Sequence, residues 1–443
     1  MSTMTNRARR ASWTTGLISL ALGTSLALAG CSGSAPANSA AVPTDAAQVT
    51  GELNILVSSA SGSDTGFKAV NAAFAKKYPD VKINFTAVPN ENYNQARSSR
   101  LSAGTIDVGL ANPRQLPSYV PESNKGDDAR LAEAGGFVDL TDQAFMKKFN
   151  ASVLQKITYN GRNYTVPTGL SYYTGLTYNK KIFADNNITV PTTWSDFIKV
   201  LDQLKAEGIT PISIGGKDTA GIVMLSVVQS LYPTAQNKDD LARGLYEHTV
   251  SLNDGKQLEV LEKVEQLYTY GQPNFAGSNY NQMTSEFLTG KAAMISDGTW
   301  NVGSLRDADK VDFGYFPLPA SDNAADNALL GGKVELSLAV PSNAKNKDAA
   351  MAWLASFADN YKLFNDEAGF APSQEGVEGD PFYTEIAKFT TTFEPAWDTI
   401  WIANTKAGQA AALPFNWNAV KPMGSMDAQG AADAAQKDWE SGK

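Results

Sequence analysis

The chain has 443 residues, a formal net charge of −9 at pH 7, one cysteine and one histidine. An acidic chain offers no electrostatic footprint for nucleic acid or for an anionic lipid surface. The lone cysteine excludes an intramolecular disulfide, and the lone histidine excludes a His-rich zinc site. The length is ample for two domains, each with a core of its own.

The first thirty residues have the order of a secretory leader. A basic start with three arginines precedes an apolar run that ends in Leu28-Ala29-Gly30-Cys31. The run is too short for a stable membrane span, and its end resembles the lipobox of bacterial lipoproteins, in which the cysteine is acylated. We therefore expect residues 1–30 to be a signal peptide and Cys31 to hold the protein on the extracellular face of the cell membrane. An ordinary signal peptide with a stray cysteine is the alternative.

Residues 31–50 would then form the lipidated end and a flexible tether. They are rich in Ser, Ala and Pro and contain little charge, so they cannot build a core. Removal of residues 1–30 leaves 443 − 30 = 413 residues, and the loss of three arginines makes the formal charge −9 − 3 = −12.

From Gly51 onward the pattern alternates between strand and helix. Predicted strands cover 53–57, 81–85 and 106–110, and predicted helices cover 67–78 and 91–103. This order favours a mainly parallel sheet covered by helices. Ligands of such sheets gather at the carboxyl ends of strands, which draws attention to the predicted loops 58–66 and 111–117.

A second α/β unit begins near Val166. Thr193 and Asp196 fit the N-cap and third position of a helix that Gly208 ends. A strand over 209–214 then leads into Lys217 and Asp218, and a further helix is predicted over 258–268.

Several short blocks follow one another in an order typical of one family. They are Tyr178-Asn179-Lys180-Lys181-Ile182-Phe183, Pro191-Thr192-Thr193-Trp194, Phe287-Leu288-Thr289-Gly290-Lys291-Ala292-Ala293-Met294, Asp297-Gly298-Thr299-Trp300, Gly331-Gly332-Lys333 and the helix 345–354. The ordered set, across roughly residues 51–420, resembles the extracellular solute-binding proteins of ABC importers. The resemblance is to the sugar-binding family that includes maltose-binding protein.

The resemblance implies an α/β, two-lobed, periplasmic-binding-protein-like fold (type II) with a hinge between the lobes. Lobe one would combine 51–165 with 315–362, and lobe two would combine 166–314 with 363–443. Such a protein binds an oligosaccharide in the cleft, closes about the hinge and passes the sugar to membrane permease subunits. It is expected to be a monomer that needs no cofactor and is not an enzyme.

Other chemistry finds little support. His248 lies in a polar stretch without a nucleophile-elbow motif, and no phosphate-binding glycine loop occurs. Asp322 and Asp326 lack the spacing of a calcium loop, so no metal site is expected.

The end of the strand 106–110 supplies two candidate ligand-binding residues, Asn112 and Arg114. Arg114 can donate two hydrogen bonds to neighbouring hydroxyls. Lys217 and Asp218 occupy the corresponding loop of lobe two. A plain turn is the alternative at both places.

Aromatic residues are the main feature of the remaining candidates, since the chain contains 8 Trp, 16 Tyr and 19 Phe. A sugar ring offers an apolar face to an aromatic ring and hydroxyls to polar groups. Trp300, with Asp297 before it, takes the position that commonly stacks on sugar in the family, although a core tryptophan is the alternative. The other candidates are Tyr172 and Tyr173 at the predicted crossing, Lys333 and Glu335, and Trp397 and Trp417. Hinge packing is the alternative for the tyrosines, and a helix-core position is the alternative for Trp397.

Two further functions compete with transport. A secreted glycoside hydrolase would need two carboxylates about 5–10 Å apart across the cleft, and no glycosidase motif is visible. A surface carbohydrate adhesin would bind polymer without domain closure.

Overall fold

The structure, a computed structural model, describes residues 40–59 and 62–443. The predicted signal peptide and residues 31–39 of the predicted lipidated tether, Cys31 among them, lie outside these residues. The described residues belong to one compact unit. Among them, no helix has both the length and the apolar character that crossing a membrane requires.

The first lobe is built on parallel strands at the start of the chain. Strand β1 (Gly51–Ser59) pairs in parallel with β2 (Val81–Pro89), and Val108 bridges Ile55 of β1 in parallel. Strand β3 (Gly109–Leu110) then pairs with β13 (Ser337–Ala339), which pairs with β6 (Val166–Pro167), both antiparallel. The predicted parallel start is confirmed, and the later strands are antiparallel because the chain returns to this lobe from the other one.

Helix α1 (Ser63–Lys77) shows why this lobe is stable. It buries Phe67, Val70 and Phe74, as its spacing predicts, against α12 (Lys347–Asp359) and α13 (Tyr361–Ala368). The loop expected over 58–66 is shorter than predicted, because β1 runs to Ser59 and α1 begins at Ser63. The remaining elements of this region are α2 (Asn90–Ser102), α3 (Asp127–Glu133), α4 (Ala151–Lys156), β4 (Thr158–Tyr159) and β5 (Arg162–Asn163).

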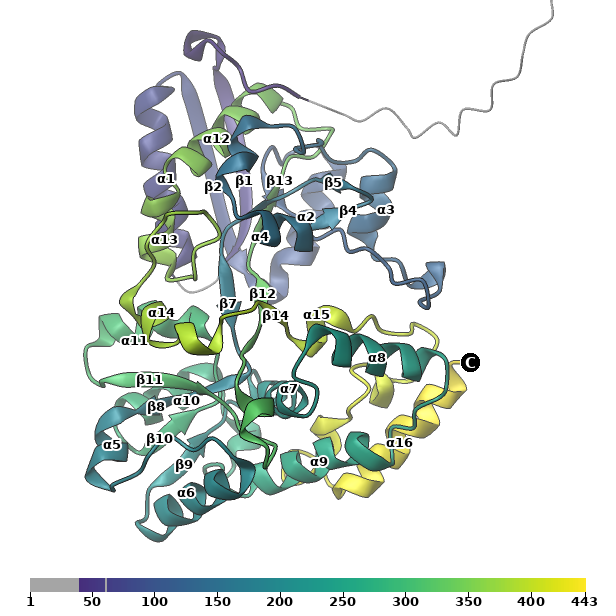
Figure 1. Ribbon diagram of the computed structural model, residues 1–443. Coiled ribbons are helices and arrows are strands. Elements are labelled where there is room, and N and C mark those ends of the chain that lie inside the picture. Colours follow the sequence, from purple (N-terminus) through teal and green to yellow (C-terminus); the bar gives the residue numbers. More distant parts are fainter. Residues whose placement is uncertain (1–39, 60–61) are drawn as a thin grey trace, which may run out of the picture. The chain divides into compact units, whose positions relative to one another are not determined.

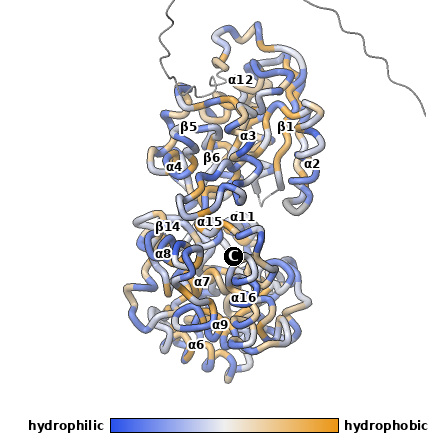
Figure 2. The backbone as a smooth tube through the Cα atoms, turned by 90° about the vertical axis from the view of Figure 1, so that its right-hand side faces the viewer, coloured by the Kyte–Doolittle hydropathy of each residue, from blue (hydrophilic) through white to orange (hydrophobic). Residues whose placement is uncertain are grey.

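The second lobe contains a mixed sheet in the order β11-β8-β10-β9. Its strands are β8 (Gly175–Asn179), β9 (Thr210–Ser213), β10 (Ala292–Ile295) and β11 (Phe313–Pro317). Its helices are α5 (Lys180–Asp185), α6 (Trp194–Ala206), α7 (Ala220–Leu231), α8 (Ala235–Tyr246), α9 (Gly255–Tyr268), α10 (Tyr280–Leu288) and α16 (Ala428–Ser441). Each lobe has its own hydrophobic core, and Figure 2 shows hydrophobic segments in orange within both.

Helix α6 begins where the sequence predicts. The side chain of Thr193 accepts a hydrogen bond of 3.3 Å from the backbone N–H of Asp196, which satisfies one of the free donors of the first turn. Gly208 follows the helix with φ +75°, a left-handed conformation that glycine adopts at no steric cost.

A small third sheet lies between the two lobes in Figure 1. In it, β12 (Gly331–Val334) pairs antiparallel with β7 (Leu170–Tyr172) and parallel with β14 (Glu394–Pro395). Three separate passages of the chain therefore form the hinge region, beside α11 (Val302–Ala308), α14 (Pro381–Glu385) and α15 (Trp397–Ile400). The lobe boundaries given above stay predictions.

Candidate ligand-binding site

Two adjoining cavities lie beside the hinge strand β12, the larger one between the lobes and the smaller one on lobe one. Their volumes are about 420 and 310 Å³, and both are lined by Asn112, Ile157, Lys333 and Val334. The larger cavity is closed on its other side by the segment 393–400, which includes α15. The smaller cavity extends over α2 and the carboxyl end of β1.

Arg114 reaches across the larger cavity. Its guanidinium donates hydrogen bonds to the backbone carbonyl oxygens of Thr399 and Trp401, the second at 3.5 Å. Burial lowers the pKa of Arg114 below its ordinary value, and the nearby Asp398 opposes this shift. Arg114, which lines the larger cavity, therefore links the loop after β3 to the segment 393–400 through hydrogen bonds.

Asn112 lies at the border of the two cavities. Its backbone N–H donates to Oδ2 of Asp128 at 2.7 Å, and the other carboxylate oxygen of Asp128 pairs with Arg97 at 2.5 Å. Arg97 and Asp128 both line the smaller cavity. Arg97 and Asp128 thus neutralise each other's charge, while both side chains still line the smaller cavity.

The tyrosines of the crossing segment are buried close to the cavity. The hydroxyl of Tyr173 donates to Oδ1 of Asp398 at 2.7 Å, and burial together with Asp398 raises the pKa of Tyr173 well above its ordinary value. The ring of Tyr172 lies 6.2 Å from that of Phe393, between centroids. Phe393 and Asp398 both line the larger cavity.

Trp300 lies in the turn after β10, in the short 3-10 helix η5 (Thr299–Asn301). Its six-membered ring packs so closely on Gly298 that a Cβ atom there would lie 2.4 Å from the ring, which is why glycine precedes Thr299. Its indole N–H donates to the hydroxyl of Tyr280 at 3.3 Å. Trp300 packs against the core clusters of both lobes.

Asp297 is fully buried beneath this turn, although the sequence favoured a ligand-facing role for it. Tyr280, Asn301 and the backbone N–H of Gly298 all donate to its carboxylate. Burial raises the pKa of Asp297 to about 7, against the lowering effect of these hydrogen bonds.

Lys333 lies between Trp300 and the cavities. Its ammonium lies 5.2 Å from the ring centroid of Trp300 and 5.9 Å from that of Tyr173, so it makes cation–π contacts with both. It also lies 3.4 Å from Oε1 of Glu335, which accepts a hydrogen bond from Ser171. Lys333 lines both cavities, whereas Trp300 lines neither.

The remaining candidates lie away from these cavities. Lys217 and Asp218 are exposed after β9, and Asp218 accepts a hydrogen bond of 2.7 Å from the backbone N–H of Tyr280. Trp397 is 1% exposed and stacks on Trp401 in the lobe-two core, the alternative that its helical spacing left open. Trp417 is partly buried against the same core.

The structure thus brings together Asn112, Arg114, Lys333 and Glu335 on the cavity walls, with Tyr173 and Trp300 directly behind them. Sequence reasoning missed Asp398, Phe393, Lys156, Tyr93, Arg97 and Asp128, which also line the cavities. For Asp398, the only sequence signal was its position next to the candidate Trp397. Its hydrogen-bond partner Tyr173 lies 225 residues away, so no local pattern connects the two.

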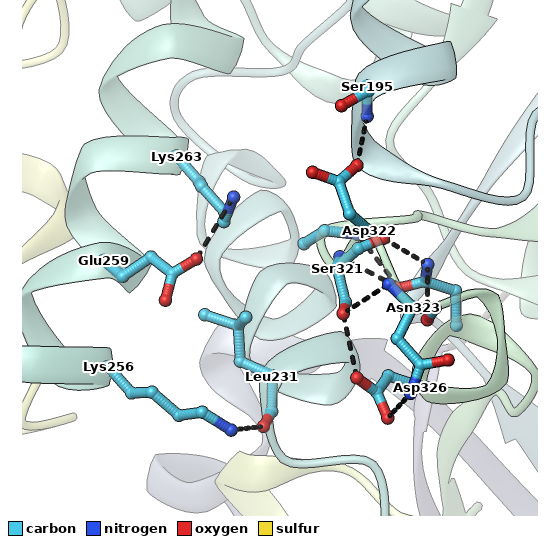
Figure 3. Close-up of polar contacts among 11 residues, drawn as sticks. Ser195, Leu231, Lys256, Glu259, Lys263, Ser321, Asp322, Asn323 and Asp326 are labelled. Atoms are coloured by element: carbon cyan, nitrogen blue, oxygen red, sulfur yellow. Dashed lines mark hydrogen bonds and ion pairs between the residues drawn. The ribbon is translucent and has the colours of Figure 1, made fainter.

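The acidic loop 321–326 has another function in the fold (Figure 3). Asp322 accepts a hydrogen bond of 2.8 Å from the backbone N–H of Ser195, which lowers its pKa and caps α6 from outside. Asp326 accepts from Ser321 and Asn323 within the same loop. Over residues 40–59 and 62–443, no group of three metal-ligating side chains occurs. A cavity of about 410 Å³ beside Asp326 and Lys256 contains none of the predicted site residues.

Residues 59–360 match the family model of the bacterial extracellular solute-binding proteins. The chain belongs to this family. The resemblance seen in the ordered sequence blocks is therefore confirmed, and the solute-binding protein has the two-lobed α/β type II fold expected from it.

Curated relatives cover much of the chain. The solute-binding protein is 24% identical over 325 residues to the Multiple sugar-binding protein of Streptococcus mutans, across 72% of this chain and 74% of that one. It is 29% identical over 265 residues to a Probable sugar-binding periplasmic protein of Mesorhizobium japonicum, across 57% and 61%.

Solved structures share the fold at lower identity. RafE in complex with raffinose matches with a TM-score of 0.73 at 20% identity, covering 89% of this chain and 100% of RafE. A chitin oligosaccharide binding protein matches with a TM-score of 0.68 at 22% identity, covering 89% and 99%.

Proposed function

We propose that this solute-binding protein captures an oligosaccharide between its lobes, closes about the hinge and delivers the sugar to the permease subunits of an ABC importer. It performs no chemistry on the sugar. The observation that carries the proposal is the composition of the two adjoining cavities, which combine mutually paired charges with aromatic rings.

The paired charges favour a neutral ligand rich in hydroxyls. Arg97 pairs with Asp128 and Lys333 pairs with Glu335, while Asp398 lies in the field of Arg114. A phosphate or an amino acid would require charged side chains that are not already paired within the protein. Sugar hydroxyls, in contrast, can accept hydrogen bonds from the paired cations and donate hydrogen bonds to the paired carboxylates. The groups on these walls suit such a rim of hydroxyls.

The aromatic rings favour a sugar over other neutral ligands. Phe393 lines the larger cavity, and Tyr173 and Trp300 lie under Lys333 at its edge. A flat ring beside polar groups fits the apolar face and polar rim of a pyranose. The similarity to a protein described as a multiple sugar-binding protein and to RafE in complex with raffinose supports the same class of ligand.

Lipid anchoring is the second part of the proposal. Cys31, the only cysteine, follows a leader with the order of a lipoprotein signal. An acylated Cys31 would hold the monomeric protein on the extracellular face of the cell membrane, where the permease takes up its ligand.

A panel of sugars tests the capture of an oligosaccharide. Raffinose, stachyose, maltotriose and chitotriose are added to residues 32–443 in a melting experiment, with glucose 6-phosphate and glutamate as charged controls. A bound sugar is expected to raise Tm by mass action, without a matching effect of the controls. Stabilisation by a charged solute alone would contradict the proposal.

The same samples separate transport from its two competitors. Hydrolysis of the bound sugar on incubation would indicate a glycoside hydrolase. X-ray scattering is expected to show a smaller radius of gyration when the sugar binds. Tight binding without compaction would favour an adhesin.

A further inference from the structure

The indole of Trp300 is held at its edge by two side chains that do not reach the cavities. Trp300 Nε1–H donates to Tyr280 Oη at 3.3 Å, and Tyr280 Oη–H donates to Asp297 Oδ2 at 2.8 Å. Tyr280 is the first residue of α10, and Asp297 follows the end of β10. The three groups form a short hydrogen-bonded chain from the buried carboxylate to the indole.

The direction of this chain depends on the charge of Asp297. Its Oδ1 accepts from the Gly298 N–H at 2.7 Å, and its Oδ2 accepts from Asn301 Nδ2 at 2.7 Å as well as from Tyr280. An ionised carboxylate can only accept hydrogen bonds. The hydroxyl of Tyr280 therefore donates its single hydrogen to Asp297, and the lone pairs of the Tyr280 oxygen remain to accept from the indole N–H. A protonated Asp297 can donate to the Tyr280 oxygen instead, which frees the Tyr280 hydroxyl proton to turn toward the indole and weakens the ordering of Trp300.

We propose that Tyr280 and Asp297 are positioning residues that hold Trp300 in the orientation needed to stack on the sugar. This inference rests on the proposed function, since it assumes that Trp300 meets the ligand once Lys333 moves from the ring. Neither Tyr280 nor Asp297 touches the sugar. They act by limiting the orientations that the indole can adopt, which lowers the entropy cost of stacking.

The surroundings of Asp297 favour titration near neutral pH. Tyr280 of α10 and Asn301 of η5 face its carboxylate, and Tyr315 of β11 donates to its backbone carbonyl oxygen at 2.8 Å. None of the ion pairs found over residues 40–59 and 62–443 includes Asp297, and the ammonium of Lys333 lies over the Trp300 ring and pairs with Glu335. With burial raising its pKa to about 7, Asp297 changes charge between pH 6 and pH 8.

The pH dependence of sugar binding is the first test. Affinity of the full chain for raffinose, or for the tightest binder of the panel, is measured by titration calorimetry from pH 6 to pH 8. If only the ionised form orders Trp300, the affinity of the wild-type protein falls by up to about tenfold from pH 8 to pH 6. Tyr280→Phe removes one hydroxyl and is expected to bind about three- to tenfold more weakly at pH 8, with a flat pH profile. Asp297→Asn, which cannot titrate, should also give a flat profile.

Two matched variants serve as controls. Tyr270 donates to Asp202 at 2.8 Å in the same lobe, so Tyr270→Phe removes an equivalent tyrosine–carboxylate bond without touching Trp300. His248, the only histidine, lies beside Trp439 with φ +55°, which asparagine tolerates, so His248→Asn removes its titration. Both should keep the affinity and the pH profile of the wild-type protein.

The outcomes separate this inference from the proposed function. A wild-type protein that binds the sugar with the same affinity from pH 6 to pH 8 would overturn the positioning inference and leave sugar capture intact. A Tyr280→Phe variant with wild-type affinity and profile would do the same. Failure of every sugar in the panel to bind would instead overturn the proposed function and, with it, this inference.

Discussion

The hydroxyl of Tyr173, the residue after hinge strand β7, donates a hydrogen bond of 2.7 Å to Oδ1 of Asp398 in the segment that closes the larger cavity. One oxygen of Asp398 is thereby oriented by a buried tyrosine, while the residue itself remains exposed at the cavity. A carboxylate that is already held in this way can accept hydrogen bonds from sugar hydroxyls at a small cost in side-chain conformational entropy.

Asp398→Ala is therefore expected to weaken sugar binding by about 1–3 kcal/mol, the usual cost of losing a charged hydrogen-bond partner. Titration calorimetry with raffinose measures the change. Asp366→Ala, which removes an exposed carboxylate paired with Lys362, is the matched control and should bind as the wild type does. Equal affinities of the two variants would contradict a role for Asp398 in binding.

Trp300→Ala is expected to cost roughly 2–4 kcal/mol of sugar binding, as for the truncation of a buried aromatic anchor. Because Trp300 packs against both core clusters, its loss should lower Tm as well. The partly buried Trp194, the first residue of α6, has the ammonium of Lys263 of α9 over its ring and provides the control Trp194→Ala. A Trp300→Ala protein that melts early but binds sugar normally would assign Trp300 to the core alone.

Lys238 gives a prediction about stability and pH. Its buried ammonium donates to Gln229 at 2.8 Å and to the Tyr232 carbonyl at 3.3 Å, and burial lowers its pKa to about 8, with Glu394 opposing the shift. The unfolded chain keeps the higher ordinary pKa and so binds more protons between pH 8 and pH 10.5. In this window, Lys238 should make the unfolding free energy rise with pH, by at most about 1.4 kcal/mol per unit.

Urea unfolding at pH 7.5, 8.5 and 9.5 measures this effect as the difference between the wild type and Lys238→Met. The unfolding free energy of the wild type should rise relative to that of Lys238→Met as the pH increases. Lys199→Met, with a side chain 76% exposed in the wild type, is the control and should show a constant difference. A constant difference for Lys238→Met as well would show that Lys238 titrates normally.

The hinge strand β12 should tolerate no side chain at Gly332. A Cβ atom there would lie 2.3 Å from the carbonyl oxygen of Ser171, so Gly332→Ala must push β12 away from β7. We expect a lower Tm and weaker sugar binding, since Lys333 follows directly. The control is Gly277→Ala, where the added Cβ meets nothing within 4 Å. Wild-type melting and binding of Gly332→Ala would show that β7 and β12 adapt easily.

Cys31→Ser tests the membrane anchor. If Cys31 carries the lipid, the variant should lose acylation and appear in the soluble fraction, as measured by fractionation and by metabolic labelling with a fatty acid. Ser32→Ala is the neighbouring control and should stay on the membrane. Unchanged retention of Cys31→Ser would remove the lipid from the proposal.

Local patterns predicted much of the fold because local contacts decide it. Thr193 and Asp196 meet within one helical turn, so the start of α6 followed from their spacing. The strand expected over 106–110 is shorter, with only Gly109 and Leu110 in β3, because its length depends on pairing with β13, more than 200 residues away.

The site was predicted in part, for a related reason. Arg114 and Lys333 were identified because each follows a strand or a glycine pair that the sequence displays. The helical spacing of Trp397 and Trp401 fits a core position as well as a cleft position, and only the tertiary packing distinguishes them. Asp398 was missed because its partners Tyr173 and Arg114 are distant in the sequence.

The threefold passage of the chain through the hinge region also bears on the order of folding. The core of lobe one combines residues from Val49 to Val166 with residues from Leu338 to Phe370, so it stays incomplete until most of the chain has been synthesised. A nascent chain that cannot close its first core remains unfolded for longer. We expect this delay to keep the chain unfolded for passage through a secretion pore, if residues 1–30 act as the secretory leader predicted from the sequence.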